Sequence, residues 1–221
     1  MLKFPCLVLD HDDTVVQTEK ALAYPCFREF IQRIRPGSDI TYQEYVRDCN
    51  RMVFADMCRE VWQFTDEELR EEYYTWKDFI RQHIPPVCPG IQRIIRRQKA
   101  EGGLICVASL STEEVIRRDY LHHFGFLPDA IYDYDLPTHL RKPNPYPLED
   151  IIKRFGLQPE QMLMVDDMKL GWDMATKVGV RTAFAAWSKE ELPEMSAQMK
   201  NIFHHSFDTP DDLYHFLFEE D

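Results

Sequence analysis

The chain has 221 residues, of which 44% are hydrophobic and 29% charged, and its formal net charge is −12. This length fits one large domain, or one domain that carries a smaller insert, and the composition is typical of a folded globular protein. The acidic balance argues against binding of DNA or RNA, because such a surface repels a phosphate backbone.

Apolar runs alternate with amphipathic segments along most of the chain. The runs lack polar alternation, which predicts strands covered on both faces, at 4–9, 104–108, 130–132, 162–165, 181–185 and 201–204. Helix-start signals between them predict helices from Pro89, from a capping box of Ser111 with Glu114, from Pro147, over 170–177 and from Thr209. This order predicts an α/β fold with a Rossmann-like parallel sheet in three layers.

Residues 17–85 interrupt the alternation, because they contain no convincing strand. Helical spacing and two capping boxes predict helices over 42–62 and 66–83; the boxes pair Thr41 with Glu44 and Thr65 with Glu68. A proline-rich return follows, at residues 85–89. We therefore expect a small helical cap domain at 17–85, inserted into a core domain formed by 1–16 and 86–221.

The cysteines and the first residues of the chain indicate the cellular compartment in which we expect the protein. The six cysteines form no CxxC pair and have no histidine spacing that suits zinc; Cys6 and Cys106 lie in apolar runs, which predicts burial. The opening MLKFPCLVLD becomes charged too soon for a signal peptide, and no apolar run approaches ~20 residues. We expect a cytoplasmic protein with free thiols and no membrane partner.

Three predicted strands end on polar residues, namely Asp10, Ser109 and Asp166. Ligands of open parallel sheets bind beyond the carboxyl ends of the strands, so these residues are candidates for one site. Asp12 and Asp167 would add further carboxylates, and crowded carboxylates stay ionised only around a cation. An oxygen-only ligand set of this kind suits Mg²⁺.

Lys142 lies in a loop, RKPNP, from which it could reach the same place. A divalent ion, a lysine, a hydroxyl and a free carboxylate together make a phosphoryl-transfer site. Taken singly, each signal has a plainer interpretation. A D-x-D can be turn chemistry, a serine can be a loop hydroxyl, a lysine can lie in solvent, and an acidic pair can cap a helix.

These residues stand in segments that resemble the four motifs of the haloacid dehalogenase-like hydrolases. LVLDHDDTVV resembles the first motif, a strand followed by D-x-D-x-T, and CVASLS is similar to the second, a strand that ends in Ser or Thr. RKPNP resembles the third, and MLMVDDMKLG resembles the fourth, an acidic pair after a strand. The resemblance covers nearly the whole chain and implies a helical cap of the first type at the insert.

The resemblance implies catalytic roles for the first motif. Asp10 would be the nucleophile that attacks phosphorus and forms an aspartyl-phosphate, and Asp12 would protonate the leaving oxygen and then activate water. Thr14 would support the loop and the phosphate. Ser109 would hydrogen-bond a phosphoryl oxygen, and Lys142 would offset negative charge on Asp10 and the phosphate. A second Asp in this motif favours phosphate ester chemistry over dehalogenation.

The resemblance also implies the metal and the cap contact. Mg²⁺ would be held by the Asp10 carboxylate, the Asp12 backbone carbonyl and Asp167, with Asp166 binding directly or through water. Arg51 lies in the predicted cap, where this family often places a substrate-facing basic residue. Closure of the cap would exclude bulk water from the reaction.

Two residues of the first motif depart from the family pattern. Asp13 stands where Gly is usual, and Asp tolerates a positive φ better than most residues, at some cost. His11 stands where an apolar residue is common; it could touch substrate or tune the site near neutral pH, although a histidine satisfied by nearby backbone is the plainer interpretation.

The leading hypothesis is a hydrolase of a small phosphorylated metabolite, such as a sugar phosphate or phosphoglycolate, acting as a monomer or homodimer. One alternative is a sugar phosphomutase of the β-phosphoglucomutase type, which carries a His twelve residues after the nucleophile, where this chain has Leu22. Another alternative is a non-catalytic protein that keeps the fold for binding.

Overall fold

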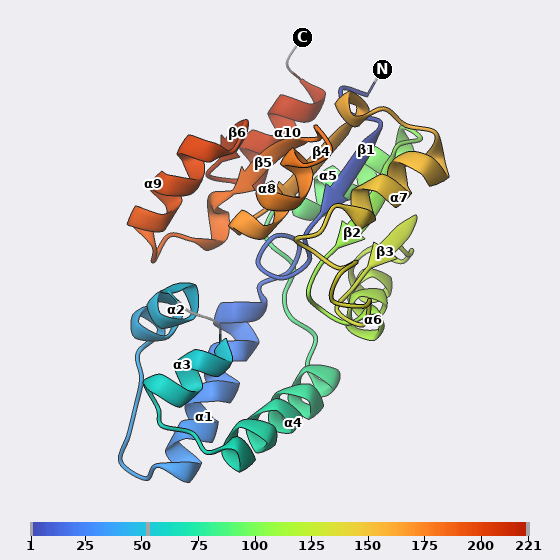
Figure 1. Ribbon diagram of the computed structural model, residues 1–221. Coiled ribbons are helices and arrows are strands. Elements are labelled where there is room, and N and C mark those ends of the chain that lie inside the picture. The colour runs from blue at the N-terminus through green and yellow to red at the C-terminus, as the bar shows by residue number, and fades with distance from the viewer. Residues whose placement is uncertain (1, 52–53, 220–221) are drawn as a thin grey trace. The chain divides into compact units, whose positions relative to one another are not determined.

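The computed structural model describes residues 2–51 and 54–219, apart from the side chains of residues 50 and 51 (Figure 1). The chain divides into two compact units. Unit 1 consists of Met1–Gln17 with Val87–Asp221, and unit 2 consists of Thr18–Pro86.

Unit 1 is built on a six-stranded sheet in which every pairing is parallel, in the order β3-β2-β1-β4-β5-β6. The strands are β1 (Cys6–Leu9), β2 (Leu104–Ala108), β3 (Ala130–Tyr132), β4 (Met162–Asp166), β5 (Arg181–Ala185) and β6 (His205–Phe207). In Figure 1 the first strand lies in the middle, between strands from much later in the chain. The predicted Rossmann-like α/β fold is confirmed.

Helices cover both faces of this sheet, which gives three layers. The helices of unit 1 are α5 (Ile91–Ala100), α6 (Glu113–Phe124), α7 (Tyr146–Phe155), α8 (Lys169–Thr176), α9 (Pro193–Ile202) and α10 (Pro210–Phe218). Leu7 and Leu9 of β1 belong to one apolar cluster with α5, α6 and α10. Cys6 and Val8 of the same strand belong to another, with α7 and α8. The alternation of β1 side chains between two cores explains why the strand reads as an unbroken apolar run.

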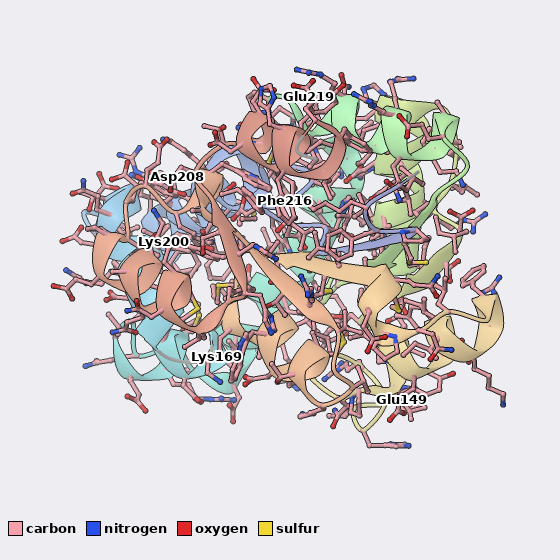
Figure 2. The ribbon with its side chains drawn as sticks, turned by 90° about the horizontal axis from the view of Figure 1, so that it is seen from above. Glu149, Lys169, Lys200, Asp208, Phe216 and Glu219 are labelled. Atoms are coloured by element: carbon pink, nitrogen blue, oxygen red, sulfur yellow. The ribbon has the colours of Figure 1, made fainter. Side chains whose placement is uncertain are left out.

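The last strand of the sheet differs from the prediction. We expected a strand at 201–204, but α9 continues to Ile202 and β6 begins at His205. The apolar residues that suggested a strand end a helix instead, and Phe203 packs on Phe184 of β5 with ring centroids 5.5 Å apart. Farther along, Phe216 of α10, labelled in Figure 2, packs on Phe207 of β6 at 5.2 Å.

Unit 2 is helical in the described residues. It contains a π-helical turn η1 (Glu19–Ala23) and the helices α1 (Tyr24–Ile34), α2 (Tyr42–Arg51), α3 (Phe54–Glu60) and α4 (Asp66–Gln82). Both predicted capping boxes are present, since Thr41 and Glu44 exchange hydrogen bonds, as do Thr65 and Glu68. Aromatic rings gather around the buried Phe27 and form the core of this unit.

None of the described helices is both long enough and apolar enough to cross a membrane. All six cysteines are free thiols, and Cys6 and Cys106 are fully buried, as predicted.

Candidate active site

The chain turns sharply where β1 ends, and this turn presents Asp10. Asp10 donates its backbone N–H to the carbonyl of Val165 on β4, at 2.9 Å, so the residue continues the sheet. The next peptide carbonyl, of His11, accepts from the N–H groups of Val15 and Val16. Residues 10–16 therefore form a compact loop at the carboxyl edge of the central strand, where ligands of such sheets bind.

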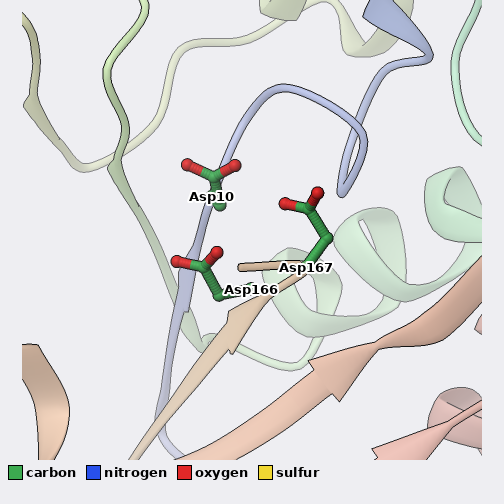
Figure 3. Close-up of side chains that lie close together, drawn as sticks. All are labelled: Asp10, Asp166 and Asp167. Carbon is green, nitrogen blue, oxygen red and sulfur yellow. The ribbon is translucent and has the colours of Figure 1, made fainter. Parts of the chain in front are cut away.

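Three carboxylates meet at this edge. Asp10, Asp166 and Asp167 each offer an oxygen within 4.8 Å of the others (Figure 3), and all three side chains are buried. Burial raises the pKa of Asp10 to about 6, although Lys142 opposes the shift, and burial raises the pKa of Asp166 well above its usual value. Negative charge is thus crowded in a poorly solvated place, which favours an additional cation.

Lys142 is the first cation of the site. Its Nζ lies 2.9 Å from Asp10 Oδ1 and 2.5 Å from Asp166 Oδ2, and the side chain is buried. Burial would lower the pKa of Lys142, but the two carboxylates outweigh it and raise the value. Lys142 therefore remains an ammonium that neutralises charge on Asp10.

Gly171 lets helix α8 approach the acidic pair. A Cβ at this position would lie 2.0 Å from Asp166 Oδ2, a distance that no real contact allows. Asp166 also accepts from the N–H of Met168, at 2.9 Å. The glycine that follows the acidic pair in the sequence is thus needed for close packing around the carboxylate.

Asp12 is held by a residue that we assigned another role. We predicted that Ser111 caps helix α6 together with Glu114, and this is wrong: α6 starts at Glu113, whose N–H donates to Asp133 Oδ2 at 2.8 Å. The Ser111 hydroxyl instead donates to Asp12 Oδ2, at 2.5 Å. This bond holds the carboxylate of Asp12 within the loop formed by residues 10–16.

The other predicted residues are placed as follows. Ser109 is buried directly after β2, next to the central strand, and its Oγ accepts from the N–H of Ser111 at 3.2 Å. Thr14 donates its hydroxyl to Asp167 Oδ1, at 3.3 Å. Arg51 ends helix α2 of unit 2, and its side chain lies outside the described residues. The structure thus gathers the core residues of the prediction at one edge of the sheet.

His11 points away from solvent into unit 1. Its Nε2 lies 3.0 Å from Asp119 Oδ2 of α6, and both side chains are almost fully buried. Burial would lower the pKa of His11, but the hydrogen bond with Asp119 and the charge of Asp12 raise it above its usual value. His11 therefore connects the loop of residues 10–16 to α6 through the side chain of Asp119, whereas the plainer interpretation had named nearby backbone as its partner.

Sequence reasoning missed Lys189, the second cation of the site. Its Nζ lies 2.8 Å from Asp167 Oδ2 and 3.7 Å from Asp13 Oδ2, and the side chain is 3% exposed. Asp13 adopts φ 56°, the left-handed conformation expected for the residue that replaces Gly. Lys189 lies several residues beyond the end of β5, so the rule that indicated Asp10, Ser109 and Asp166, which considers only residues at a strand end, does not indicate it.

The residues at this edge fit a divalent cation. Carboxylate and carbonyl oxygens are the ligands that Mg²⁺ prefers, and the raised pKa values of Asp10 and Asp166 show a charge that a metal would offset. Asp10, Asp166 and Asp167, which each offer an oxygen within 4.8 Å of the others, are the residues that would hold it.

Comparison with known proteins identifies the family. The profile of the family described as "Haloacid dehalogenase-like hydrolase" matches residues 7–185. The chain belongs to this family. A phosphoglycolate phosphatase of Aquifex aeolicus (strain VF5) is 28% identical over 135 residues, a match that covers 57% of this chain and 61% of the relative.

Solved structures of similar proteins share the fold. A protein of unknown function from Agrobacterium tumefaciens superposes with a TM-score of 0.79 at 16% identity, over 96% of this chain and 97% of its own. A predicted phosphoglycolate phosphatase from Haemophilus somnus gives 0.75 at 16% identity, over 98% and 99%. CbbY from Rhodobacter sphaeroides, solved with xylulose-1,5-bisphosphate, gives 0.67 at 16% identity, over 95% and 96%.

Proposed function

We propose that this protein is a Mg²⁺-dependent phosphatase that hydrolyses a small phosphate monoester through a phosphorylated Asp10. The observation that carries the proposal is the placement of two differently held carboxylates in one loop. Asp10 is buried against Lys142, whereas Asp12 is held by the hydroxyl of Ser111. One carboxylate is thus arranged to attack and the other to exchange a proton.

The proposed reaction has two halves. In the first, an oxygen of Asp10 attacks phosphorus while Asp12 gives its proton to the leaving alcohol. In the second, Asp12 takes a proton from water, which attacks the phosphoryl group on Asp10 and releases phosphate. Lys142 and Ser109 would bind the phosphoryl oxygens. The metal would supply positive charge against the developing phosphoryl charge when bound.

The substrate is proposed by class. A phosphatase for phosphoglycolate or for a sugar phosphate would agree with the phosphoglycolate phosphatases and with the xylulose-1,5-bisphosphate complex of CbbY among the similar proteins. Leu22 is an apolar, buried residue at the place where the mutase would need a His, which favours hydrolysis. Unit 2 would act as the cap, and the six free thiols support a cytoplasmic setting.

The test is a phosphate-release assay with a panel of phosphorylated metabolites, with Mg²⁺ or with EDTA. We expect release from at least one phosphomonoester, and we expect EDTA to abolish it. Asp10→Asn should lower kcat by roughly 10⁴-fold or more, because no nucleophile remains. Asp208→Asn is the matched control, since Asp208 is exposed and pairs with Lys200.

Two results would refute the proposal. One is Asp10→Asn protein that folds and retains more than a few per cent of wild-type kcat. The other is an isomerised sugar phosphate, without free phosphate, as the product of glucose 1-phosphate. A wild-type protein that leaves the whole panel untouched would favour the non-catalytic alternative.

A further inference from the structure

Lys189 holds a carboxylate that the proposed function reserves for the metal. Its Nζ lies 2.8 Å from Asp167 Oδ2, and both side chains are 3–4% exposed. An ammonium and a divalent cation at one carboxylate repel each other strongly, because little water screens a buried site. Binding of both Lys189 and the metal to the carboxylate of Asp167 therefore costs free energy, because the two cations repel each other.

The chain fixes Lys189 from both sides. A short 3₁₀ helix, η3 (Ala186–Ser188), follows β5, and the N–H of Lys189 donates to the carbonyl of Ala186. Its own carbonyl accepts from the N–H of Leu192 and from the hydroxyl of Ser196. The backbone of Lys189 is thus anchored, so a change of its carboxylate partner would involve the side chain alone.

The same turn is joined by hydrogen bonds to the loop of residues 10–16. The Ser188 hydroxyl donates to the carbonyl of Asp13 at 2.5 Å, and Trp187 Nε1 donates to the carbonyl of Thr14 at 3.3 Å. These bonds keep the lysine within reach of two carboxylates, those of Asp167 and Asp13. Hydrogen bonds of the surrounding turn therefore hold Lys189 beside the site, and its position is not an accidental surface contact.

Asp13 gives the lysine a second partner. It is buried and adopts φ 56°, where a glycine would fit without strain, yet the chain has a carboxylate there. The Asp13 oxygen lies 3.7 Å from Lys189 Nζ, farther than that of Asp167. A small movement of the lysine side chain would exchange one carboxylate for the other.

We propose that Lys189 is a built-in competitor of the metal, which occupies Asp167 in the metal-free protein and moves to Asp13 when a divalent cation binds. This inference rests on the proposed use of a metal. It adds that the protein holds its metal weakly, so that metal occupancy follows the free Mg²⁺ concentration. It also gives a function to a buried lysine and a buried aspartate that the proposed reaction does not use.

The test measures metal affinity directly, with no substrate. Mn²⁺ binding to the full chain is followed by EPR, and Mg²⁺ affinity is obtained by displacement of Mn²⁺ at constant ionic strength. Lys189→Met keeps the length of the side chain and removes its charge, and we expect Kd for Mg²⁺ to fall by about tenfold or more. Lys200→Met is the matched control, because Lys200 is exposed and pairs with Asp208 (Figure 2); its Kd should stay within twofold.

A second variant tests the exchange between carboxylates. Asp13→Asn should keep the fold, because Asn tolerates positive φ. We expect it to raise Kd at least threefold in the wild-type background and much less in the Lys189→Met background, since no ammonium then needs a second partner. Equal effects in the two backgrounds would overturn the exchange.

The outcomes separate this inference from the proposed function. If the wild type binds metal and folded Lys189→Met has an unchanged or higher Kd, the competition is refuted and the phosphatase proposal is untouched. If neither protein binds Mn²⁺ or Mg²⁺, the proposed metal dependence fails and the inference falls with it. If Lys189→Met does not fold without metal, its recovery of structure on addition of Mg²⁺, followed by circular dichroism, would support the competition, and failure to recover would overturn it.

Discussion

The two units bury charge in contrasting ways. Unit 1 places several carboxylates at the end of its sheet and surrounds them with Lys142 and Lys189, both buried. Unit 2 builds its core from aromatic rings around Phe27, and Glu72 is the one charged side chain that is buried among its described residues. Burial raises the pKa of Glu72 to about 7.

This difference in how charge is buried distinguishes the candidate active site of unit 1 from the aromatic core of unit 2. Buried charges that are matched by opposite charges and hydrogen bonds can be retained at neutral pH, where they can do chemistry. A carboxylate that is buried without such compensation instead weakens the fold when it ionises. We therefore expect substitutions of the unit 1 carboxylates to alter catalysis and substitution of Glu72 to alter stability.

The largest effect in this comparison is expected for Asp12→Asn. Loss of the proton donor should lower kcat by roughly 10²- to 10⁴-fold for alkyl phosphates. The loss should be much smaller for p-nitrophenyl phosphate, whose leaving group needs no proton. Steady-state kinetics with both substrates would check this, and equal losses for the two would contradict the role of Asp12 as the acid.

Glu72→Gln should stabilise the protein at neutral and alkaline pH. The ordinary pKa of a Glu carboxyl is 4.5 and that of folded Glu72 is about 7, so the folded state binds more protons between these values. Stability of the wild type therefore falls as pH rises through this window, and it falls by about 1–3 kcal/mol more than in Glu72→Gln.

Urea unfolding of both proteins at about pH 5 and about pH 8 would measure this difference. The neighbouring Glu71→Gln is the control, because Glu71 forms an exposed ion pair with Arg33 at 2.8 Å. If Glu72→Gln were no more stable than the wild type at the higher pH, the uncompensated burial of Glu72 would be disproved.

The smallest effect concerns the start of helix α4. Thr65→Ala removes the hydroxyl that accepts from the N–H of Glu68 and should destabilise the protein by about 1 kcal/mol. Thr75→Ala, in the middle of the same helix, is the control and should be neutral or stabilising, because Ala is the better helix former. Thermal unfolding followed by circular dichroism measures both, and equal effects would mean that the cap contributes nothing.

Much of the fold and several candidate residues could be predicted from local patterns. Strands covered on both faces appear as unbroken apolar runs, and the residues that end them share one edge of the sheet. This reasoning indicates Asp10, Ser109 and Asp166 from their places at the ends of predicted strands. Their catalytic roles stay predictions, as does that of Arg51, whose side chain lies outside the described residues.

The predictions that failed or were not made depend on contacts between segments that are distant in the sequence. Ser111 has the spacing of a helix cap, yet its hydroxyl bonds Asp12, which lies 99 residues earlier. Lys189 follows a strand by several residues, so its position gave no direct signal that it reaches Asp167. The strand expected at 201–204 failed because a helix end and a short edge strand both offer apolar residues, and only packing decides between them.

The central claim is that Asp10 becomes phosphorylated during turnover. The most direct test is to quench the wild type with acid while it turns over a substrate found in the panel, reduce acyl phosphates with borohydride, and map the modified residue by peptide mass spectrometry. The account predicts conversion of Asp10 to homoserine in the wild type, with none in Asp10→Asn. Conversion at another carboxylate, or none in a protein that is turning over substrate under conditions that favour the intermediate, would contradict it.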